Sequence, residues 1–221
     1  MKTLKIDFVS DVACPWCAVG LGGLLAALDR LKQDARFEIR MQPFELNPDM
    51  PPEGQNSVER LMRKYGYDKP RVHESRKVIA ERAAAVGMPM AVTDDSRTYN
   101  TFDAHRLLYW AGLQGQEQQI ALKRSLLKTY FYDNRNTTDP LVLAQAARDA
   151  GLDEQAAREV AESDRYADEV RAEEEKWRGL GISSVPSLVI NDKYLVSGGQ
   201  PPDVFEEALR SILAEEGASA A

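Results

Sequence analysis

The first forty residues place alternating hydrophobic and polar positions on either side of a helical stretch. Ile6 and Phe8 alternate with Asp7, as in a strand buried on one face. The same alternation returns in the segment Phe37-Glu38-Ile39-Arg40-Met41. Between these segments, leucines recur at the spacing of one helix face: Leu21, Leu24, Leu25, Leu28 and Leu31. The pattern predicts a β-α-β unit over residues 3–42.

A long helical region follows a proline-rich break at residues 42–54, a composition typical of a domain crossing. From about residue 57 to residue 178 the pattern predicts helix throughout. The charged run at residues 169–176 indicates a solvated helix face. Residues typical of helix starts and ends mark three of these helices: Pro70 with Gly87, Thr101 with Gly112, and Pro140 with Gly151.

Strand patterns return near the C-terminus. The segments Val185–Ile190 and Tyr194–Ser197 are short apolar runs joined by three polar residues, which predicts a hairpin. Pro201 and Pro202 then lead into a final helix. Together, these patterns predict one α/β domain made of residues 1–50 and 179–214, a helical insertion over residues 51–178, and a disordered tail over residues 215–221.

Composition and charge narrow the functional classes. The chain is 43% hydrophobic and 29% charged, the balance of an ordinary globular protein. Its formal net charge of −7 argues against nucleic acid or an anionic membrane as the main partner. No apolar stretch approaches the roughly 20 residues of a membrane span, and Met1–Ile6 leads into a strand pattern without a visible secretory signal. We therefore expect a cytoplasmic protein.

The only two cysteines, Cys14 and Cys17, enclose Pro15 and Trp16 at the junction of the first strand and the first helix. At the start of a helix, unpaired N–H groups and the helix dipole favour a thiolate. Pro15 suits the first helical position because its φ is pre-set and it has no N–H to lose. Cys17 lies about one turn further along, within reach of a mixed disulfide at Cys14. This arrangement predicts a thiol–disulfide redox protein.

A zinc half-site or two inert buried thiols would be the structural alternatives for this pair. Structural zinc sites need about four ligands. The chain has no second cysteine pair, and its two histidines, His73 and His105, are distant in sequence. We therefore predict no metal site. A stable structural disulfide would be unusual in the cytoplasm, which also favours a catalytic pair.

Five separated segments carry a family resemblance: SDVACPWC at residues 10–17, PFELNP at 43–48, NTFDAHRL at 100–107, GISSVPSLVI at 181–190 and SGGQ at 197–200. In this order they resemble the DsbA family of the thioredoxin superfamily, and its FrnE-like cytoplasmic branch in particular. The resemblance implies a thioredoxin fold, with a helical domain over the active site. It also implies that Cys14 is an exposed nucleophile and Cys17 a buried resolving cysteine.

The same resemblance implies a cis peptide bond between Val185 and Pro186 that faces the dithiol. A proline at the start of a strand removes one donor from the strand ladder, so its presence needs a reason. A sharp turn there would leave the backbone of Val185 to pair with an extended substrate strand, which is a sequence-tolerant mode of binding. Val185 and Pro186 are therefore candidate substrate-binding residues.

Other candidate site residues have two interpretations each. Trp16 either offers an apolar surface to substrates or covers the dithiol. Asp7, near the family's buried acid, either accepts a proton during exchange or serves the fold. His105 either faces a substrate cleft between the domains or fixes the insertion to the core, whereas Asp11 more simply caps the turn before the dithiol. Aromatic and methionine side chains are expected in the core or, where open, in an apolar groove for a polypeptide: Phe44, Met88, Met90, Phe102 and Trp110.

The leading functional prediction is a thiol–disulfide oxidoreductase acting on polypeptide or small disulfide and thiol substrates. No cofactor is implied, although glutathione could serve as a redox partner. One alternative is a glutathione-dependent enzyme like the kappa-type transferases and 2-hydroxychromene-2-carboxylate isomerases, which usually carry serine or a lone cysteine at this site. Another is a redox-gated binding module without turnover. The sequence predicts neither the direction of exchange nor the oligomeric state.

Overall fold

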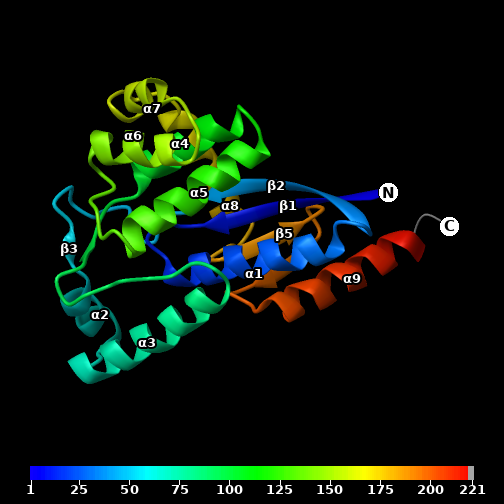
Figure 1. Ribbon diagram of the computed structural model, residues 1–221, viewed down its shortest axis with the longest axis horizontal. Coiled ribbons are helices and arrows are strands. Elements are labelled where there is room, and N and C mark those ends of the chain that lie inside the picture. The colour runs from blue at the N-terminus through cyan, green and yellow to red at the C-terminus, as the bar shows by residue number, and fades with distance from the viewer. Residues whose placement is uncertain (219–221) are drawn as a thin grey trace.

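The computed structural model describes residues 1–218 and contains a central four-stranded sheet (Figure 1). In the order β2-β1-β5-β6, strand β1 (Lys2–Ser10) pairs in parallel with β2 (Ala35–Pro43) and antiparallel with β5 (Ser187–Ile190). Strand β6 (Tyr194–Ser197) pairs antiparallel with β5, which confirms the predicted hairpin. The parallel pairing of β1 and β2 needs a crossover, and the helix between them supplies it, as the predicted β-α-β unit requires.

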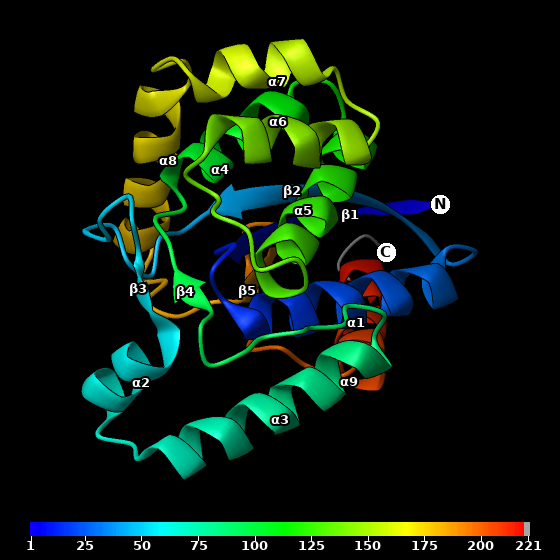
Figure 2. The same cartoon turned by 60° about the vertical axis from the view of Figure 1, so that its left-hand side comes forward.

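Helices cover both faces of this sheet. Helices α1 (Pro15–Leu31) and α9 (Pro202–Ala218) lie side by side on one face (Figures 1 and 2). The opposite face is covered by α8 (Ala167–Gly179), where Trp177 packs against Val9 of β1. Because side chains of a strand alternate between the two faces, every second residue of β1 joins the buried cluster beneath α1 and α9: Leu4, Ile6 and Phe8.

The insertion supplies the other helices: α2 (Ser57–Tyr65), α3 (Lys69–Ala85), α4 (Phe102–Gly112), α5 (Gln116–Phe131), α6 (Pro140–Asp149) and α7 (Glu154–Ala161). Helices α4 to α7 form a group on one side of the sheet, whereas α3 contacts α1 (Figure 1). Several helix ends follow the predicted signals. Pro70 and Pro140 lie in the first turns of α3 and α6, and Gly87 and Gly151 follow these helices with φ of 74° and 81°.

The prediction of helix throughout residues 57–178 is wrong between α3 and α4. There, strand β4 (Arg97–Thr98) pairs with β3 (Gln55–Asn56) in a small two-stranded sheet. Side chains hold the connecting loop, since the Asn134 amide donates to the carbonyl of Ala91 over 2.7 Å. Two-residue strands are too short to produce a periodic hydrophobic pattern, so the sequence gives no signal for them.

Amide side chains of α5 cover the outer edge of β2. Gln116 Oε1 accepts the N–H of Ile39 (3.0 Å), and Gln119 Oε1 accepts the N–H of Met41 (2.8 Å). The same two side chains donate to the carbonyls of Phe37 and Met41, at 3.3 Å in each case. Because an edge strand leaves backbone groups unpaired, these contacts take the place of a further strand.

This arrangement confirms the predicted α/β thioredoxin fold with a helical insertion between sheet strands. Helix α9 continues to Ala218, so residues 215–218 are helical where a disordered tail was predicted; residues 219–221 lie outside the described residues. The Lys2 ammonium donates to the carbonyl of Leu213 (3.0 Å), which joins the start of β1 to the last helix. Within residues 1–218, no helix is both long and apolar enough to cross a membrane.

Candidate active site

The two cysteines lie where β1 gives way to α1. Cys14 is the last residue before the helix, with an extended backbone (φ −99°, ψ 111°), and Pro15 lies in the first turn. The N–H of Cys14 donates to the carbonyl of Asp11 (3.3 Å), and the N–H of Cys17 donates to the carbonyl of Cys14 (3.0 Å). No side chain caps this end of the helix. The dithiol therefore occupies a helix start whose N–H groups lack side-chain acceptors.

The two thiols differ in burial. Cys17 is fully buried and Cys14 is 5% exposed, and both are free thiols. The implied exposure of Cys14 is therefore corrected, because Cys14 is buried and its Sγ donates to the carbonyl oxygen of Val185 over 3.6 Å. Burial, together with the adjacent Cys14 side chain, raises the pKa of the Cys17 thiol well above its ordinary value. The pair thus consists of one nearly buried and one fully buried cysteine.

The loop before β5 lies against the dithiol. Its Val185–Pro186 peptide bond is cis, as the family resemblance implied. Pro186 is packed tightly on α1, since a Cβ added to Gly20 would lie 2.9 Å from Pro186 Cγ. The carbonyl of Pro186 accepts the N–H of Gly198 (2.8 Å). Because β5 begins at Ser187, the half-buried Val185 lies just outside the strand ladder and next to Cys14.

Trp16 is half-buried between the loop after β6 and helix α3. A Cβ added to Gly199 would lie 3.2 Å from Trp16 Cε3. On the other side, the guanidinium carbon of Arg82 lies 5.4 Å from the ring centroid, a cation–π distance. The ring covers part of the first turn of α1 and keeps some exposed surface, so its geometry fits both predicted interpretations.

Asp11 connects the turn before the dithiol to the helical insertion. Its Oδ1 accepts the Thr101 hydroxyl (2.8 Å) and the N–H of Ala13 (3.1 Å), and its Oδ2 accepts the N–H of Leu46 (2.8 Å). Burial alone would raise the pKa of this carboxyl, but the His105 ring and the two N–H groups lower the pKa below its usual range. Asp11 is therefore an ionised, buried acceptor, in keeping with the capping role predicted for it.

His105 is buried next to Asp11. Its side chain is buried in α4, and its Nε2 lies 3.5 Å from Asp11 Oδ1, an ion-pair distance without hydrogen-bond geometry. A contact of His105 with substrate therefore stays a prediction, whereas the alternative, a contact that fixes the insertion to the core, describes what the buried ring touches. Within residues 1–218, no group of three or more His, Cys, Asp or Glu side chains is placed to hold a metal ion.

Asp7 lies on the other side of the sheet from the dithiol. Its neighbours Ile6 and Phe8 belong to the cluster beneath α1, so Asp7 points to the face that α8 covers. Partial burial raises the pKa of its carboxyl, whereas a hydrogen bond from Gln42 and the charge of Lys176 act to lower it. The prediction that Asp7 takes the proton of the resolving cysteine is not compatible with this position.

A buried lysine is the group that the sequence analysis missed. Lys123 of α5 is fully buried, and its charge interacts with Cys17, Asp11 and Cys14. A signal for it exists in the sequence, because a lysine at position 123 interrupts a helical stripe of buried residues: Gln119, Leu122, Leu126, Leu127 and Tyr130. The site therefore contains a basic side chain contributed by the insertion.

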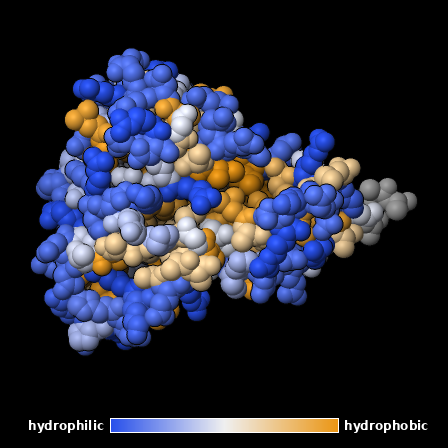
Figure 3. All heavy atoms as spheres, in the orientation of Figure 1, coloured by the Kyte–Doolittle hydropathy of each residue, from blue (hydrophilic) through white to orange (hydrophobic). Residues whose placement is uncertain are grey.

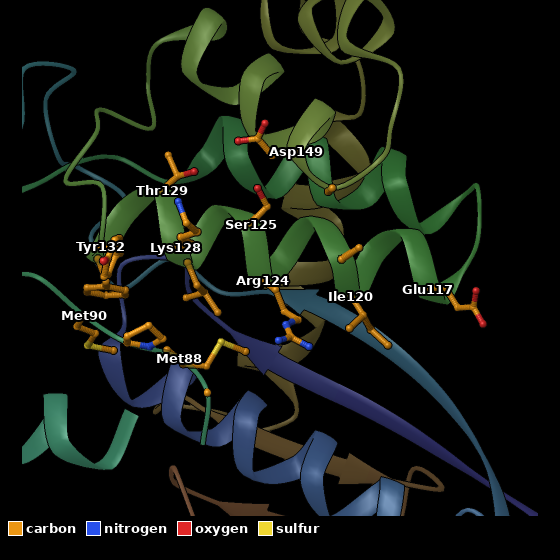
Figure 4. A pocket seen from close by; sticks show the side chains of 17 residues that line it. Met88, Met90, Glu117, Ile120, Arg124, Ser125, Lys128, Thr129, Tyr132 and Asp149 are labelled. Carbon is orange, nitrogen blue, oxygen red and sulfur yellow. The ribbon is translucent and has the colours of Figure 1, made fainter. Parts of the chain in front are cut away.

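Apolar side chains gather in a hollow between α5 and α1 (Figure 3). This cavity has a volume of about 910 Å³. Figure 4 shows the side chains that line it, from α5 and from the loop after α3. Ala18 lines it, one position beyond the dithiol, together with Met88 and Met90. Phe44 and Trp110 are instead buried in the interior. Phe102 is half-buried, with the Arg171 guanidinium carbon 3.7 Å from its ring centroid, so the predicted aromatic and methionine set does not form one groove.

A thiol pair at a helix start, with one sulfur against a cis-proline loop on this sheet, defines a dithiol protein of thioredoxin fold. The sequence itself matches the model of the DSBA-like thioredoxin domain over residues 5–210. The chain therefore belongs to the DSBA-like thioredoxin domain family. No curated protein sequence matches it.

Solved structures with this fold include a probable DsbA oxidoreductase from Streptomyces coelicolor, which is 33% identical to the chain. The match has a TM-score of 0.86 and covers 96% of this chain and 91% of that one. A 2-hydroxychromene-2-carboxylate isomerase is 17% identical, with a TM-score of 0.69 and coverage of 98% and 99%. The cytosolic disulfide reductase DsbM from Pseudomonas aeruginosa is also 17% identical, with a TM-score of 0.65 and coverage of 95% and 98%. The last two similarities concern the fold alone.

Proposed function

We propose that this protein is a cytoplasmic, FrnE-like thiol–disulfide oxidoreductase in which Cys14 is the nucleophile and Cys17 the resolving thiol. The asymmetry of the pair carries the proposal. Cys14 keeps 5% of its surface exposed whereas Cys17 keeps none, and the Cys14 sulfur lies 3.6 Å from the Val185 carbonyl, beside the cis Pro186. An approaching disulfide therefore meets Cys14 first, with extended backbone next to it.

Exchange takes two displacement steps. The Cys14 thiolate attacks one sulfur of a substrate disulfide, so that a Cys14–substrate S–S bond forms, the substrate S–S bond breaks and one substrate thiolate leaves. Cys17 then attacks Cys14 Sγ, which releases the second substrate thiolate and forms the Cys14–Cys17 disulfide. Two electrons pass from the dithiol to the substrate. The reverse steps oxidise a dithiol substrate, and the reduction potential of the pair against that of its surroundings sets the direction.

The substrates we propose are polypeptide or small disulfides. Val185 lies just before β5 and beside Cys14, where its backbone can pair with an extended chain, and the half-buried Trp16 offers apolar surface. The class of activity is supported by the similar Streptomyces chain, which is named a probable DsbA oxidoreductase. Glutathione is the proposed redox partner, and the DsbM structure solved with GSH gives a precedent within this fold.

The reduction of insulin disulfides, coupled to glutathione recycling, tests the proposal. We expect turnover by the wild type and none by Cys14→Ser, because only Cys14 can begin the exchange. We expect Cys17→Ala to stall as a covalent Cys14–substrate adduct, which mass spectrometry of the intact protein detects. The measured reduction potential of the Cys14–Cys17 couple then gives the direction of exchange.

Each alternative predicts a different result. A glutathione-dependent transferase or isomerase needs one sulfur only, so continued turnover by Cys17→Ala would contradict the dithiol mechanism. A redox-gated binding module predicts no insulin reduction by the wild type, but a partner affinity that changes between the dithiol and disulfide forms. Either outcome would replace the proposed function.

A further inference from the structure

Helix α5 buries a lysine without a partner. Lys123 is fully buried, and its Nζ makes no hydrogen bond with any described residue. An isolated ammonium away from water is strongly unfavourable, and burial accordingly lowers the pKa of Lys123. Lys123 therefore loses its proton more readily than an exposed lysine does. Once neutral, its amine has an open lone pair and can act as a base.

The charges that act on this amine are those of the dithiol and of the turn before it. Its strongest electrostatic partner is Cys17, followed by Asp11 and Cys14. Cys17 lies in α1, which contacts α5 directly, and Cys14 and Asp11 lie in the turn before α1. From α4, His105 reaches Asp11, with 3.5 Å between Nε2 and Oδ1. These are the titratable groups around Lys123.

The resolving step needs a base at this place. Cys17 must lose its proton before it attacks Cys14, yet burial raises the pKa of the Cys17 thiol. Asp7 lies on the opposite face of the sheet. Asp11 is a weak base, because its oxygens already accept hydrogen bonds from Thr101 and two N–H groups. Of the two buried basic side chains here, Lys123 rather than His105 is the one whose charge acts on the Cys17 thiol.

We infer that Lys123 accepts the proton of the Cys17 thiol in the resolving step, an inference that rests on the proposed function. As the Cys17 S–H bond breaks, its proton passes to Lys123 Nζ, and the electron pair left on Cys17 forms the bond to Cys14 Sγ. The S–S bond between Cys14 and the substrate breaks, and the substrate leaves as a thiolate. The ammonium then returns the proton to solvent or to the departing thiolate.

The test uses 5,5′-dithiobis(2-nitrobenzoate), or DTNB, as the disulfide, because its two thiolates are released in separate, visible steps. The first release reports attack by Cys14, and the second reports resolution by Cys17. We compare the reduced wild type with Lys123→Met, which keeps most of the length of the side chain but removes the base. Lys128→Met is the matched control, because Lys128 lies on the same helix, is exposed and pairs with Asp133.

For Lys123→Met, we expect the second release to slow at least tenfold at neutral pH, in line with the usual contribution of a positioned base. Its rate should then rise with pH across the neutral range, because the Cys17 thiol must ionise unaided. The first release should remain within about twofold of the wild type, which also checks that the variant is folded. Lys128→Met should match the wild type in both phases.

A second pair of variants separates proton acceptance from charge. Lys123→Gln cannot accept a proton and should behave like Lys123→Met. Lys123→Arg keeps a positive charge but is always protonated, so it should also resolve slowly. The inference is overturned if Lys123→Met and Lys123→Gln resolve at the wild-type rate and pH profile, or if Lys123→Arg restores that rate. A wild type that releases only one thiolate would instead refute the proposed function.

Discussion

Asp11 joins the dithiol turn to a helix that lies about ninety residues further along the chain. The Thr101 hydroxyl, the His105 ring and two backbone N–H groups all surround its carboxylate. Removing the charge would leave several buried donors with a poorer acceptor, and such losses cost more than the bonds themselves contribute. The side chain therefore matters to the placement of the cysteines without taking part in exchange.

Asp11→Asn is expected to lower the free energy of unfolding by about 1.5–3 kcal/mol at pH 7. The pKa of Asp11 is lowered in the fold, so its contribution is present above the unfolded value of 3.8 and is lost as the pH falls through the lower folded value. The difference between wild type and variant should shrink correspondingly at acid pH. Urea unfolding at neutral and acid pH measures this difference in the free energy of unfolding. A difference that does not change with pH would contradict the role of the ionised Asp11 carboxylate. Asp29→Asn, at an exposed ion pair, is the control.

The buried Lys123 side chain is expected to destabilise the fold, and its replacement should therefore raise the free energy of unfolding. Lys123→Met is expected to raise the free energy of unfolding by about 1–3 kcal/mol, because a buried amine without a partner is replaced by an apolar chain. Since the folded pKa of Lys123 lies below the unfolded 10.5, the unfolded chain binds more protons between these values. The free energy of unfolding of the wild type should therefore rise with pH in that window. Its difference from the free energy of unfolding of Lys123→Met should become smaller. Unfolding of the reduced proteins at several pH values checks this; a destabilised Lys123→Met would contradict it.

Individual site residues could be predicted from the sequence only where the signal is local. Cys14 and Cys17 are marked by their spacing at a strand–helix junction, and the cis bond before Pro186 follows from the family resemblance. Lys123 and His105 reach the dithiol only through tertiary packing from distant helices. Asp7 was misplaced because the period of a strand does not say which face lies beneath α1.

Glycines let the loop after β6 approach α1. A Cβ at Gly199 would lie 2.7 Å from the carbonyl oxygen of Trp16, and one at Gly20 would lie 2.9 Å from Pro186 Cγ. Neither neighbour can move far, because one is helix backbone and the other a proline ring. The SGGQ and VPS segments are therefore packed on the first turns of α1 as one unit.

Gly199→Ala is expected to destabilise the protein by about 1–3 kcal/mol, as overpacking does. It should also reduce the rate of the first thiolate release from DTNB, since the loop and Trp16 must shift away from the dithiol. Gly179→Ala is the control, because no atom lies within 4 Å of its added Cβ. Thermal unfolding and the release assay measure both effects. Equal behaviour of the two variants would show that the approach at Gly199 is not restrictive.

Regular elements were predicted well where hydrophobic periodicity is long enough. The β-α-β unit, the β5–β6 hairpin and the final helix all follow from it. The β3–β4 pair was missed because its strands have two residues each and their hydrogen bonds involve segments some forty residues apart. The role of α8 was also hidden, because a charged helix pattern does not reveal that Trp177 packs on the sheet.

The insertion and the sheet form one physical unit around the dithiol. Arg82 of α3 lies over Trp16, Thr101 precedes α4 and binds Asp11, and the charge of Lys123 in α5 acts on Cys17. One buried cluster also includes residues of both α1 and α5. The sequence could predict an interrupted domain, but not that the interruption completes the site.

We therefore expect a single cooperative unfolding transition. Variants that keep one tryptophan each, Trp110 in α4 or Trp177 in α8, report separately on the insertion and on the sheet. Their fluorescence should change at the same urea concentration, because neither part retains its buried surface alone. Two distinct midpoints would show that the insertion unfolds independently, and would weaken the coupling drawn between α5 and the dithiol.

The two glutamines along β2 have a consequence for assembly. Because Gln116 and Gln119 bind the backbone of β2, this edge strand cannot form a ladder of hydrogen bonds with another polypeptide. The other border strand, β6, has a paired neighbour on one side only. Within the described residues, a chain that extends the sheet must therefore pair with β6, whether it is a second copy or a misfolded segment. Strand β6 lies at the opposite edge of the sheet from β2, which α5 covers.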